Sequence, residues 1–163
     1  PVYLDTVGTV LTSALAGPVA GVAVGLLSQS VRSLYEGFIW LPFAAVQVLI
    51  ALLAVLAAAR GGFRSLPRSI AWGLFVGLAA GLLSAAISFF VFKGVTATGV
   101  TAVTILLTRL GLTTGQAVTV SSLGTDLVDK TLVFALVGKF TDTCLLALSA
   151  PFVRWQDNHA REY

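Results

Sequence analysis

Two stretches of this chain are apolar for long enough to cross the hydrocarbon core of a membrane. A transmembrane helix needs about 20 such residues, and residues 37–59 and 69–92 contain no charged side chain. Between them, residues 60–68 carry three arginines. Because positively charged loops are enriched on the cytoplasmic side, this segment predicts the cytoplasmic ends of both helices.

The apolar segment before these helices is interrupted. Gly17-Pro18 combines a helix stop with a proline at a helix start, so we expect two short helices, over residues 5–16 and 18–33. At about 1.5 Å per residue, the first is too short to cross upright. We expect a partial crossing, buried against neighbouring helices, with residues 32–40 on the outer side.

The pattern after the second long helix is less regular. Residues 93–121 are rich in threonine and glycine, with amphipathic spacing over residues 100–110, and predict an outer cap lying across the bundle. A last long helix over residues 122–150 would return the chain to the cytoplasm. The residues that follow are polar and charged, as expected of an aqueous tail.

These segments predict an all-α fold, a polytopic transmembrane helical bundle in which five helices of this chain cross the membrane. The bundle is a single substrate-binding domain over residues 1–163, with a cytoplasmic tail from about residue 152. An odd number of crossings and a first residue other than methionine predict a missing sixth helix before Pro1. We expect a multi-pass plasma-membrane protein with a cytoplasmic C-terminus.

The composition agrees with a lipid environment. Hydrophobic residues make up 57% of the chain and charged residues only 10%, whereas soluble domains are about a quarter charged. The net charge of +3 is small and its basic residues are scattered, so nucleic acid is not expected as a partner. Cys144 is the only cysteine, which excludes an internal disulfide and a multi-cysteine metal site.

Motifs of the common catalytic sites are missing. His159 is the only histidine, and the sequence contains no HExxH, no GxSxG and no glycine-rich loop ending in Lys-Ser or Lys-Thr. We therefore expect neither an enzyme nor a bound cofactor or metal. If the chain takes part in active transport, ATP is used by partner subunits.

Glycines recur at four-residue spacing on two predicted helices. The two ladders are Gly17, Gly21, Gly25 and Gly73, Gly77, Gly81. Such spacing places small residues on one helix face and lets backbones approach closely. The ladders predict either packing within the chain or a face offered to a separate membrane subunit.

Three ionisable residues lie in the last apolar helix. A charge within the membrane is costly unless it is paired or hydrated. Asp126 and Lys130 are four residues apart and can pair on one helix face, which leaves Asp129 in need of a partner. These residues predict a cavity, a partner contact or an ion route, whereas Asp5 is expected to cap the first short helix.

Polar and aromatic residues gather at the outer mouth of the predicted bundle: Gln29, Arg32, Tyr35, Glu36 and Trp40. They suit a pocket for a flat, polar solute that contains a ring, although Tyr35 and Trp40 equally fit an interfacial aromatic belt. The loop over residues 94–99 could close over this pocket. Ser84, Ser88 and Gln47, within predicted helices, would line the same cavity or bond neighbouring helices.

The order of several of these motifs along the chain resembles that in a known protein family. Tyr3-Leu-Asp-Thr-Val-Gly-Thr9, Gly17-Pro18, Leu66-Pro-Arg68, Lys93-Gly-Val-Thr-Ala-Thr-Gly99 and Asp126-Leu-Val-Asp129-Lys130 follow one another along the chain. In this order the chain resembles the S components of energy-coupling factor (ECF) transporters, from Pro1 to about Pro151.

The resemblance implies a six-helix, vitamin-binding membrane subunit without enzymatic activity. It also implies a transmembrane coupling subunit and two cytoplasmic ATPases as partners, and toppling in the membrane to release the solute. The residues implied around the ligand are Gln29, Arg32, Tyr35, Glu36, Trp40, Lys93, Thr96, Thr98, Asp126 and Lys130. The chain departs from the family in lacking its first helix, whose small-residue motif contacts the coupling subunit, and Gly21 and Gly25 would extend that face.

The leading hypothesis is a binding subunit for a water-soluble vitamin or a related heterocycle. The alternative is a self-sufficient secondary transporter or channel, with Asp126, Asp129 and Lys130 as an ion relay. A third hypothesis, a structural subunit of a larger membrane complex, agrees with the glycine ladders but leaves the outer polar cluster unexplained.

Overall fold

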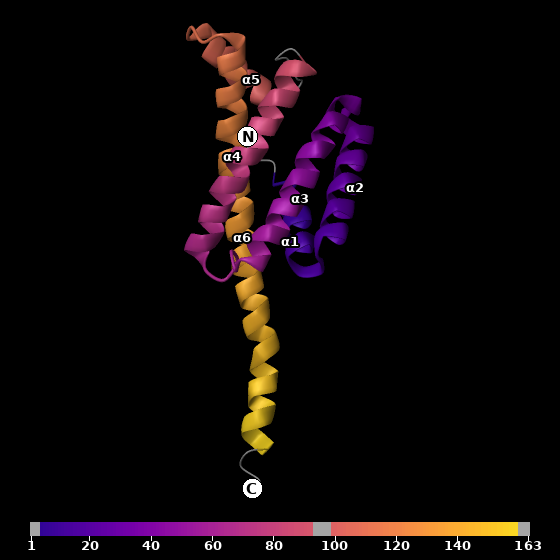
Figure 1. Cartoon of the computed structure of the whole chain (residues 1–163), viewed down its shortest axis with the longest axis vertical. Coiled ribbons are helices and arrows are strands. Elements are labelled where there is room, and N and C mark those ends of the chain that lie inside the picture. Colours follow the sequence, from indigo (N-terminus) through magenta and orange to yellow (C-terminus); the bar gives the residue numbers. More distant parts are fainter. Residues whose placement is uncertain (1–3, 93–98, 160–163) are drawn as a thin grey trace.

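The computed structural model describes residues 4–92 and 99–159, and these residues form an all-α fold (Figure 1). They contain six α-helices and one 3₁₀-helix, η1. The elements are α1 (Val7–Ala16), α2 (Pro18–Glu36), η1 (Phe38–Phe43), α3 (Ala44–Ala59), α4 (Leu66–Phe90), α5 (Gly99–Arg109) and α6 (Thr114–His159). The all-α prediction is confirmed.

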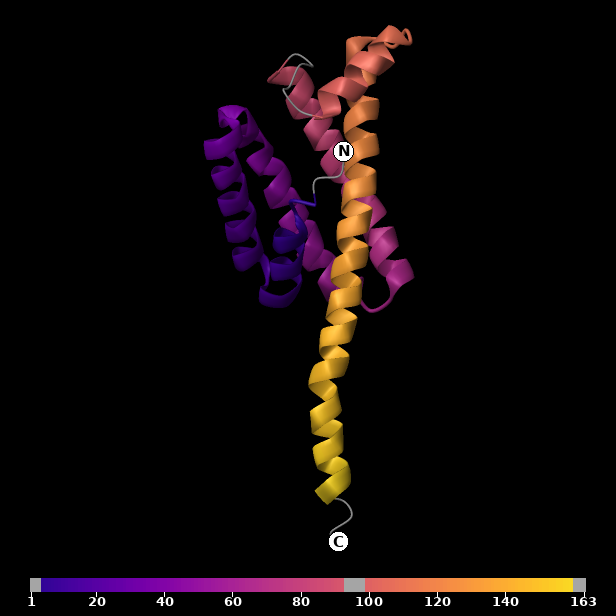
Figure 2. The ribbon, with the colours of Figure 1, turned by 180° about the vertical axis from the view of Figure 1, so that it is seen from behind.

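The helices form two packed groups. α1, α2 and α3 pack on one another, and α4 and α5 each pack along α6. α3 and α1 join the groups through contacts with α4 and α6, respectively. Figures 1 and 2 show α6 extending past the other helices at the end where the α3–α4 loop lies.

The predicted break between two short N-terminal helices is confirmed. Gly17 ends α1 with a φ of 86°, and Pro18 occupies the first turn of α2. A positive φ is nearly free of strain only in glycine, and the missing N–H of proline costs nothing in a first turn. The chain therefore reverses here, so α1 and α2 lie side by side.

The long helix expected over residues 37–59 is divided. Gly37 has a φ of 105°, residues Phe38–Phe43 form the 3₁₀-helix η1, and α3 begins at Ala44. Pro42 lies within η1, where its ring and missing N–H disfavour a regular α-helix. This division turns Trp40 and Phe43 towards the interior of the bundle, where both line a cavity.

Within the described residues, two helical segments are long and apolar enough to cross a membrane, Phe38–Ala59 with 22 residues and Leu66–Phe90 with 25. They correspond to the two clearest predicted spans. Many of their large apolar side chains face outward, as do others on α6: Leu52, Leu56, Leu74, Phe75, Leu78, Leu82, Leu132, Leu136 and Phe140.

The last helix starts earlier and ends later than expected. α5 forms within the predicted cap, but α6 already begins at Thr114 rather than residue 122, and it continues to His159. Its start is a capping box: Thr113 N–H donates to Gln116 Oε1 at 3.1 Å, and Gln116 N–H donates to Thr113 Oγ1 at 3.4 Å. A threonine followed three residues later by glutamine is a helix-start signal, so α6 begins earlier than the predicted residue 122 for a local reason.

Both glycine ladders lie between helices of this chain. A Cβ atom at Gly73 would lie 2.7 Å from Thr131 Cα, at Gly77 2.8 Å from Leu127 Cα, and at Gly81 2.9 Å from Leu123 Cα. The backbones of α4 and α6 are therefore close enough to exclude any side chain. On α2, Gly25 lies against Thr9 and Gln47, whereas Gly17 has no neighbour near its Cβ position.

Substitution of Gly21 is expected to disturb the α1–α2 contact. A Cβ atom there would overlap Ser13 and lie 2.9 Å from its Cα, so Gly21→Ala should lower the free energy of unfolding by about 1–3 kcal/mol. Gly8→Ala is the control, because its Cβ would meet only Val24 at 3.6 Å. Thermal unfolding in detergent compares them, and equal melting temperatures would contradict the prediction.

Candidate functional site

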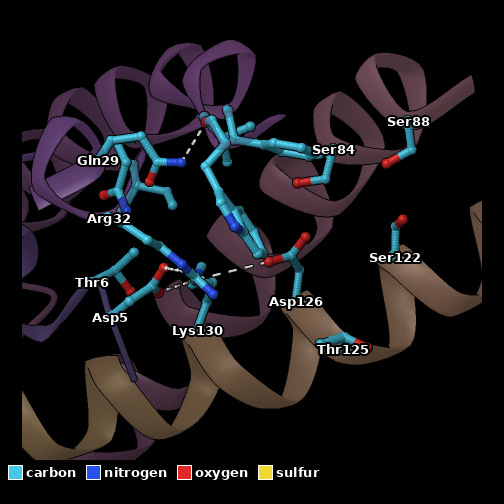
Figure 3. Close-up of a pocket in the computed structure, with 15 residues that line it drawn as sticks. Asp5, Thr6, Gln29, Arg32, Ser84, Ser88, Ser122, Thr125, Asp126 and Lys130 are labelled. Carbon is cyan, nitrogen blue, oxygen red and sulfur yellow. Dashed lines mark hydrogen bonds and ion pairs between the residues drawn. The ribbon is translucent and has the colours of Figure 1, made fainter. Parts of the chain in front are cut away.

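A cavity of about 80 Å³ lies where α2, η1, α3, α4, α6 and the segment before α1 converge (Figure 3). Its polar lining residues are Asp5, Thr6, Gln29, Arg32, Gln47, Ser84, Ser88, Ser122, Thr125, Asp126 and Lys130. Its apolar and aromatic lining residues are Trp40, Phe43, Val46 and Ile50. Because α2 and α4 contribute residues near their C-terminal ends, the cavity lies in the half of the bundle away from the α3–α4 loop.

Lys130 is the centre of a buried ion network. Only 4% of this residue is exposed, and its Nζ lies 2.6 Å from Asp129 Oδ2, 3.7 Å from Asp126 Oδ1 and 3.7 Å from Asp5 Oδ1. The predicted pairing of Lys130 with Asp126 is confirmed, but Asp129 is the nearer partner. The network joins α6 to Asp5, two residues before the start of α1.

Asp129, for which the sequence predicted no partner, is paired in the structure. Its carboxylate accepts a hydrogen bond from the backbone N–H of Leu4 at 2.8 Å, in addition to that from Lys130. Asp129 is 1% exposed, and a buried carboxylate is tolerated when it is paired and hydrogen-bonded. This bond fixes the chain before α1 against the middle of α6.

Arg32 forms a second charged centre at the end of α2. Its guanidinium lies 3.0 Å from Asp5 Oδ2 and 3.0 Å from Glu36 Oε2, and its central carbon lies 3.6 Å from the centroid of a Trp40 ring. A guanidinium over an aromatic face is attracted by the ring quadrupole. Arg32 therefore holds Trp40 and Asp5 at the cavity together.

The expected helix-capping role of Asp5 is wrong. Thr6, not Asp5, occupies the position before α1, and the Thr6 side chain makes no capping hydrogen bond. The Asp5 carboxylate points instead to Arg32 and Lys130. Two basic groups in a partly buried site attract a carboxylate more strongly than the exposed N–H groups of a short helix.

Hydrogen bonds and rings shape the remaining wall. The Gln29 amide donates to the carbonyl oxygen of Trp40, and Thr9 Oγ1 donates to Gln47 Oε1 at 3.1 Å. The Trp40 and Phe43 rings lie 5.8 Å apart. Ser84 points towards Asp126 across the cavity (Figure 3), so hydroxyl, amide, carboxylate and aromatic groups all face the same space.

Half of the implied ligand-binding residues line the cavity: Gln29, Arg32, Trp40, Asp126 and Lys130. Tyr35 is 87% exposed and does not line the cavity, although at about 100° per residue it lies only about 60° from Arg32 around α2. Glu36 does not line the cavity, but it pairs with Arg32. Lys93, Thr96 and Thr98, and with them the predicted lid, lie outside the described residues.

Other lining residues were not assigned to the pocket from the sequence. Asp5 and Thr6 precede α1, Phe43 ends η1, Ser122 lies one turn before Asp126, and Thr125 directly precedes Asp126. The spacing of Ser122, Asp126 and Lys130 by four residues is a signal of one shared helix face. No comparable local signal joins Asp5 to α6, because more than a hundred residues separate them.

Comparison of the chain with models of protein families, with curated proteins and with solved structures gave no match. The interpretation of the cavity therefore depends on its geometry. The cavity combines carboxylates that accept hydrogen bonds, hydroxyls that donate or accept them, and an aromatic wall. Such groups bind a small polar solute and fix its orientation.

Proposed function

We propose that this chain is a membrane-embedded binding subunit that captures a small water-soluble solute. The observation that supports the proposal is the polar and aromatic cavity inside a bundle whose outer side chains are apolar. At about 80 Å³ it is well below the roughly 300–1,000 Å³ of pockets for drug-sized ligands. A single-ring heterocycle suits this volume better than a large vitamin.

Placement in the plasma membrane is part of the proposal. Large outward-facing leucines on α3, α4 and α6 would otherwise form an unusually extensive apolar surface. In this arrangement α2, η1–α3, α4 and α6 cross the bilayer, α1 crosses it partly, and the arginines of residues 60–68 face the cytoplasm. The cavity then opens towards the outer face, and the end of α6 is cytoplasmic.

We further propose that the chain acts as the S component of an ECF-type importer. The solute, a water-soluble vitamin or a related heterocyclic micronutrient, would be taken up with a separate transmembrane coupling subunit and two cytoplasmic ATPases. The motif order described above supports this assignment. Because Gly21, Gly25, Gly73, Gly77 and Gly81 lie near other helices of the chain, the coupling subunit would contact other faces.

Purification without added ligand tests the proposed function. Mass spectrometry of small molecules extracted from the purified protein should identify a bound solute, and that solute should raise the melting temperature. Affinity purification from native membranes should recover two ATPases with the chain. A preparation that holds no small molecule and responds to no vitamin or nucleobase would contradict the proposal.

The buried ion network supports one alternative, a secondary transporter or channel. Asp126, Asp129 and Lys130 lie in close succession on α6, and the last two are almost fully buried. Ionisable groups inside a membrane frequently form ion or proton routes. Uptake by the isolated chain in liposomes, driven by an ion gradient without ATP, would favour this alternative.

Trp40 is expected to contribute to solute binding. Trp40→Ala removes the aromatic wall but keeps the carbonyl that Gln29 contacts, so affinity for the extracted solute should fall about tenfold. Tyr35→Ala, also on the outer side but 87% exposed, should leave affinity unchanged. Calorimetric titration of both variants measures this, and an unaltered affinity in Trp40→Ala would place the ligand elsewhere.

A further inference from the structure

Two buried serines of the cavity wall have hydroxyls without a hydrogen-bond partner. Ser88 on α4 and Ser122 on α6 line the cavity and are only 5% and 3% exposed. Neither hydroxyl bonds another of the described residues, whereas the adjacent Ser121 donates to the Ala117 carbonyl oxygen at 2.7 Å and accepts from Thr104 at 3.0 Å. Because a buried hydroxyl without a partner is costly, the two serines indicate a polar group that enters the cavity.

The packing of α4 on α6 places these two serines opposite each other. The helices are antiparallel, as the order of the glycine contacts along them shows. Ser84 on α4 bonds Asp126 on α6, and one turn from this pair, in the same direction along both helices, lie Ser88 and Ser122. Figure 3 shows both serine oxygens directed towards the space between the helices. No hydrogen bond joins the two hydroxyls, so a carbonyl oxygen between them, with its two lone pairs, can accept from both.

The charged residues of the lining do not select a charged solute. They are two acids and two bases, Asp5, Asp126, Arg32 and Lys130. Their formal charges cancel, and Figure 3 shows Ser88 and Ser122 at the other end of the cavity from Lys130. An ion next to these hydroxyls would lack an opposite charge to offset its desolvation. The serine end of the cavity therefore suits an uncharged polar group.

We infer that Ser88 and Ser122 form a subsite that binds an uncharged carbonyl or carboxamide group of the solute. The inference deepens the proposed function and rests on it. The solute is then a single-ring heterocycle that carries such a group, with its ring against Trp40 and Phe43, which line the same cavity and favour contact with flat rings. Ser122 and Asp126 are one turn apart, about 6 Å along α6, a separation that one substituted ring spans.

Three pyridines with the same ring and different substituents test the inference. Nicotinamide carries an uncharged carboxamide, 3-methylpyridine has no hydrogen-bonding substituent, and nicotinate carries an ionised carboxylate. Titration calorimetry at neutral pH, with the purified full chain in nanodiscs, should show nicotinamide binding at least about tenfold more tightly than 3-methylpyridine, equivalent to about 1.4 kcal/mol. Nicotinate should bind more weakly than nicotinamide, because nothing at the serine end offsets its charge.

Two serine variants separate solute binding from folding. Ser88→Ala/Ser122→Ala removes both unpartnered hydroxyls, so the melting temperature of the solute-free protein should hold or rise, while the ratio between nicotinamide and 3-methylpyridine falls to near one. Ser121→Ala is the matched control, because its hydroxyl is as deeply buried, at 2% exposure, but is bonded and does not line the cavity. This variant should melt at a lower temperature and keep the ratio.

The other results would overturn the inference. A ratio retained in Ser88→Ala/Ser122→Ala would show that water, rather than the solute, satisfies the two hydroxyls. Equal affinities for nicotinamide and 3-methylpyridine in the unmodified chain would exclude a carbonyl subsite, as would tighter binding of nicotinate or binding of none of the three. The proposed function is judged separately, by the solute extracted from the protein, so a chain that holds a solute but fails these tests loses only the subsite.

Discussion

We expect Lys130→Met to lower the free energy of unfolding by about 3–5 kcal/mol, the cost of removing one partner from a buried ion pair. The substitution keeps an unbranched side chain but leaves Asp129, which is 1% exposed, without its cation at 2.6 Å. Asp126 and Asp5 lose the same neighbour. Of the basic groups among the described residues, Arg32 would remain beside Asp5.

Unfolding in mixed micelles, followed by circular dichroism, measures this effect. Lys139→Met is the control, because Lys139 lies on the same helix and is exposed. Adding Asp129→Asn to Lys130→Met should restore part of the loss, since the amide oxygen can still accept the Leu4 N–H without an unpaired charge. Equal stability of Lys130→Met and Lys139→Met would show that the network contributes nothing.

The second large effect is expected from Gly77→Leu. A Cβ atom at Gly77 would lie 2.8 Å from the Asp126 carbonyl oxygen and 2.8 Å from Leu127 Cα, so α4 and α6 must separate. Backbone atoms cannot rotate away as a flexible side chain can, and overpacking of this kind costs about 3 kcal/mol. Because the displaced backbone includes Asp126, solute binding should also be lost.

Gly124→Leu is the matched control for this substitution. Gly124 lies on α6, and no other helix among the described residues comes within 4 Å of its Cβ position. Leucine also favours a helix over glycine by about 0.5–1 kcal/mol, so stability should hold or rise. If Gly77→Leu melts at the same temperature as Gly124→Leu, the close approach of α4 and α6 is not required for the fold.

Helix positions followed from local signals. Gly17-Pro18 divides α1 from α2, and Pro67 lies in the first turn of α4. At both places a proline in the sequence marks the start of a helix. The errors were also local: Pro42 and the positive φ of Gly37 divide the helix predicted over residues 37–59. The start of α6 at Thr114 also has a local cause, the capping box of Thr113 and Gln116, although the helix was predicted to begin at residue 122.

The candidate site was only partly predictable. The pairing of Asp126 with Lys130 follows from helix periodicity within one segment, and so does the shared face of Gln29 and Arg32. Tyr35 does not line the cavity, and its 87% exposure agrees with the alternative of an interfacial aromatic belt. The hydrogen bond that Asp129 accepts from the Leu4 N–H could not be predicted in this way, because Leu4 is 125 residues away.

The sequence by itself determined the all-α class, the two most apolar helices and the glycine faces, because hydropathy, turn residues and four-residue spacing act within one segment. Only the tertiary structure decided that Asp5 joins Lys130 and Arg32 rather than capping a helix, and that the glycines of α4 lie against α6. Which buried charges share a cavity depends on contacts between distant segments, and such contacts arise from the packing of whole helices.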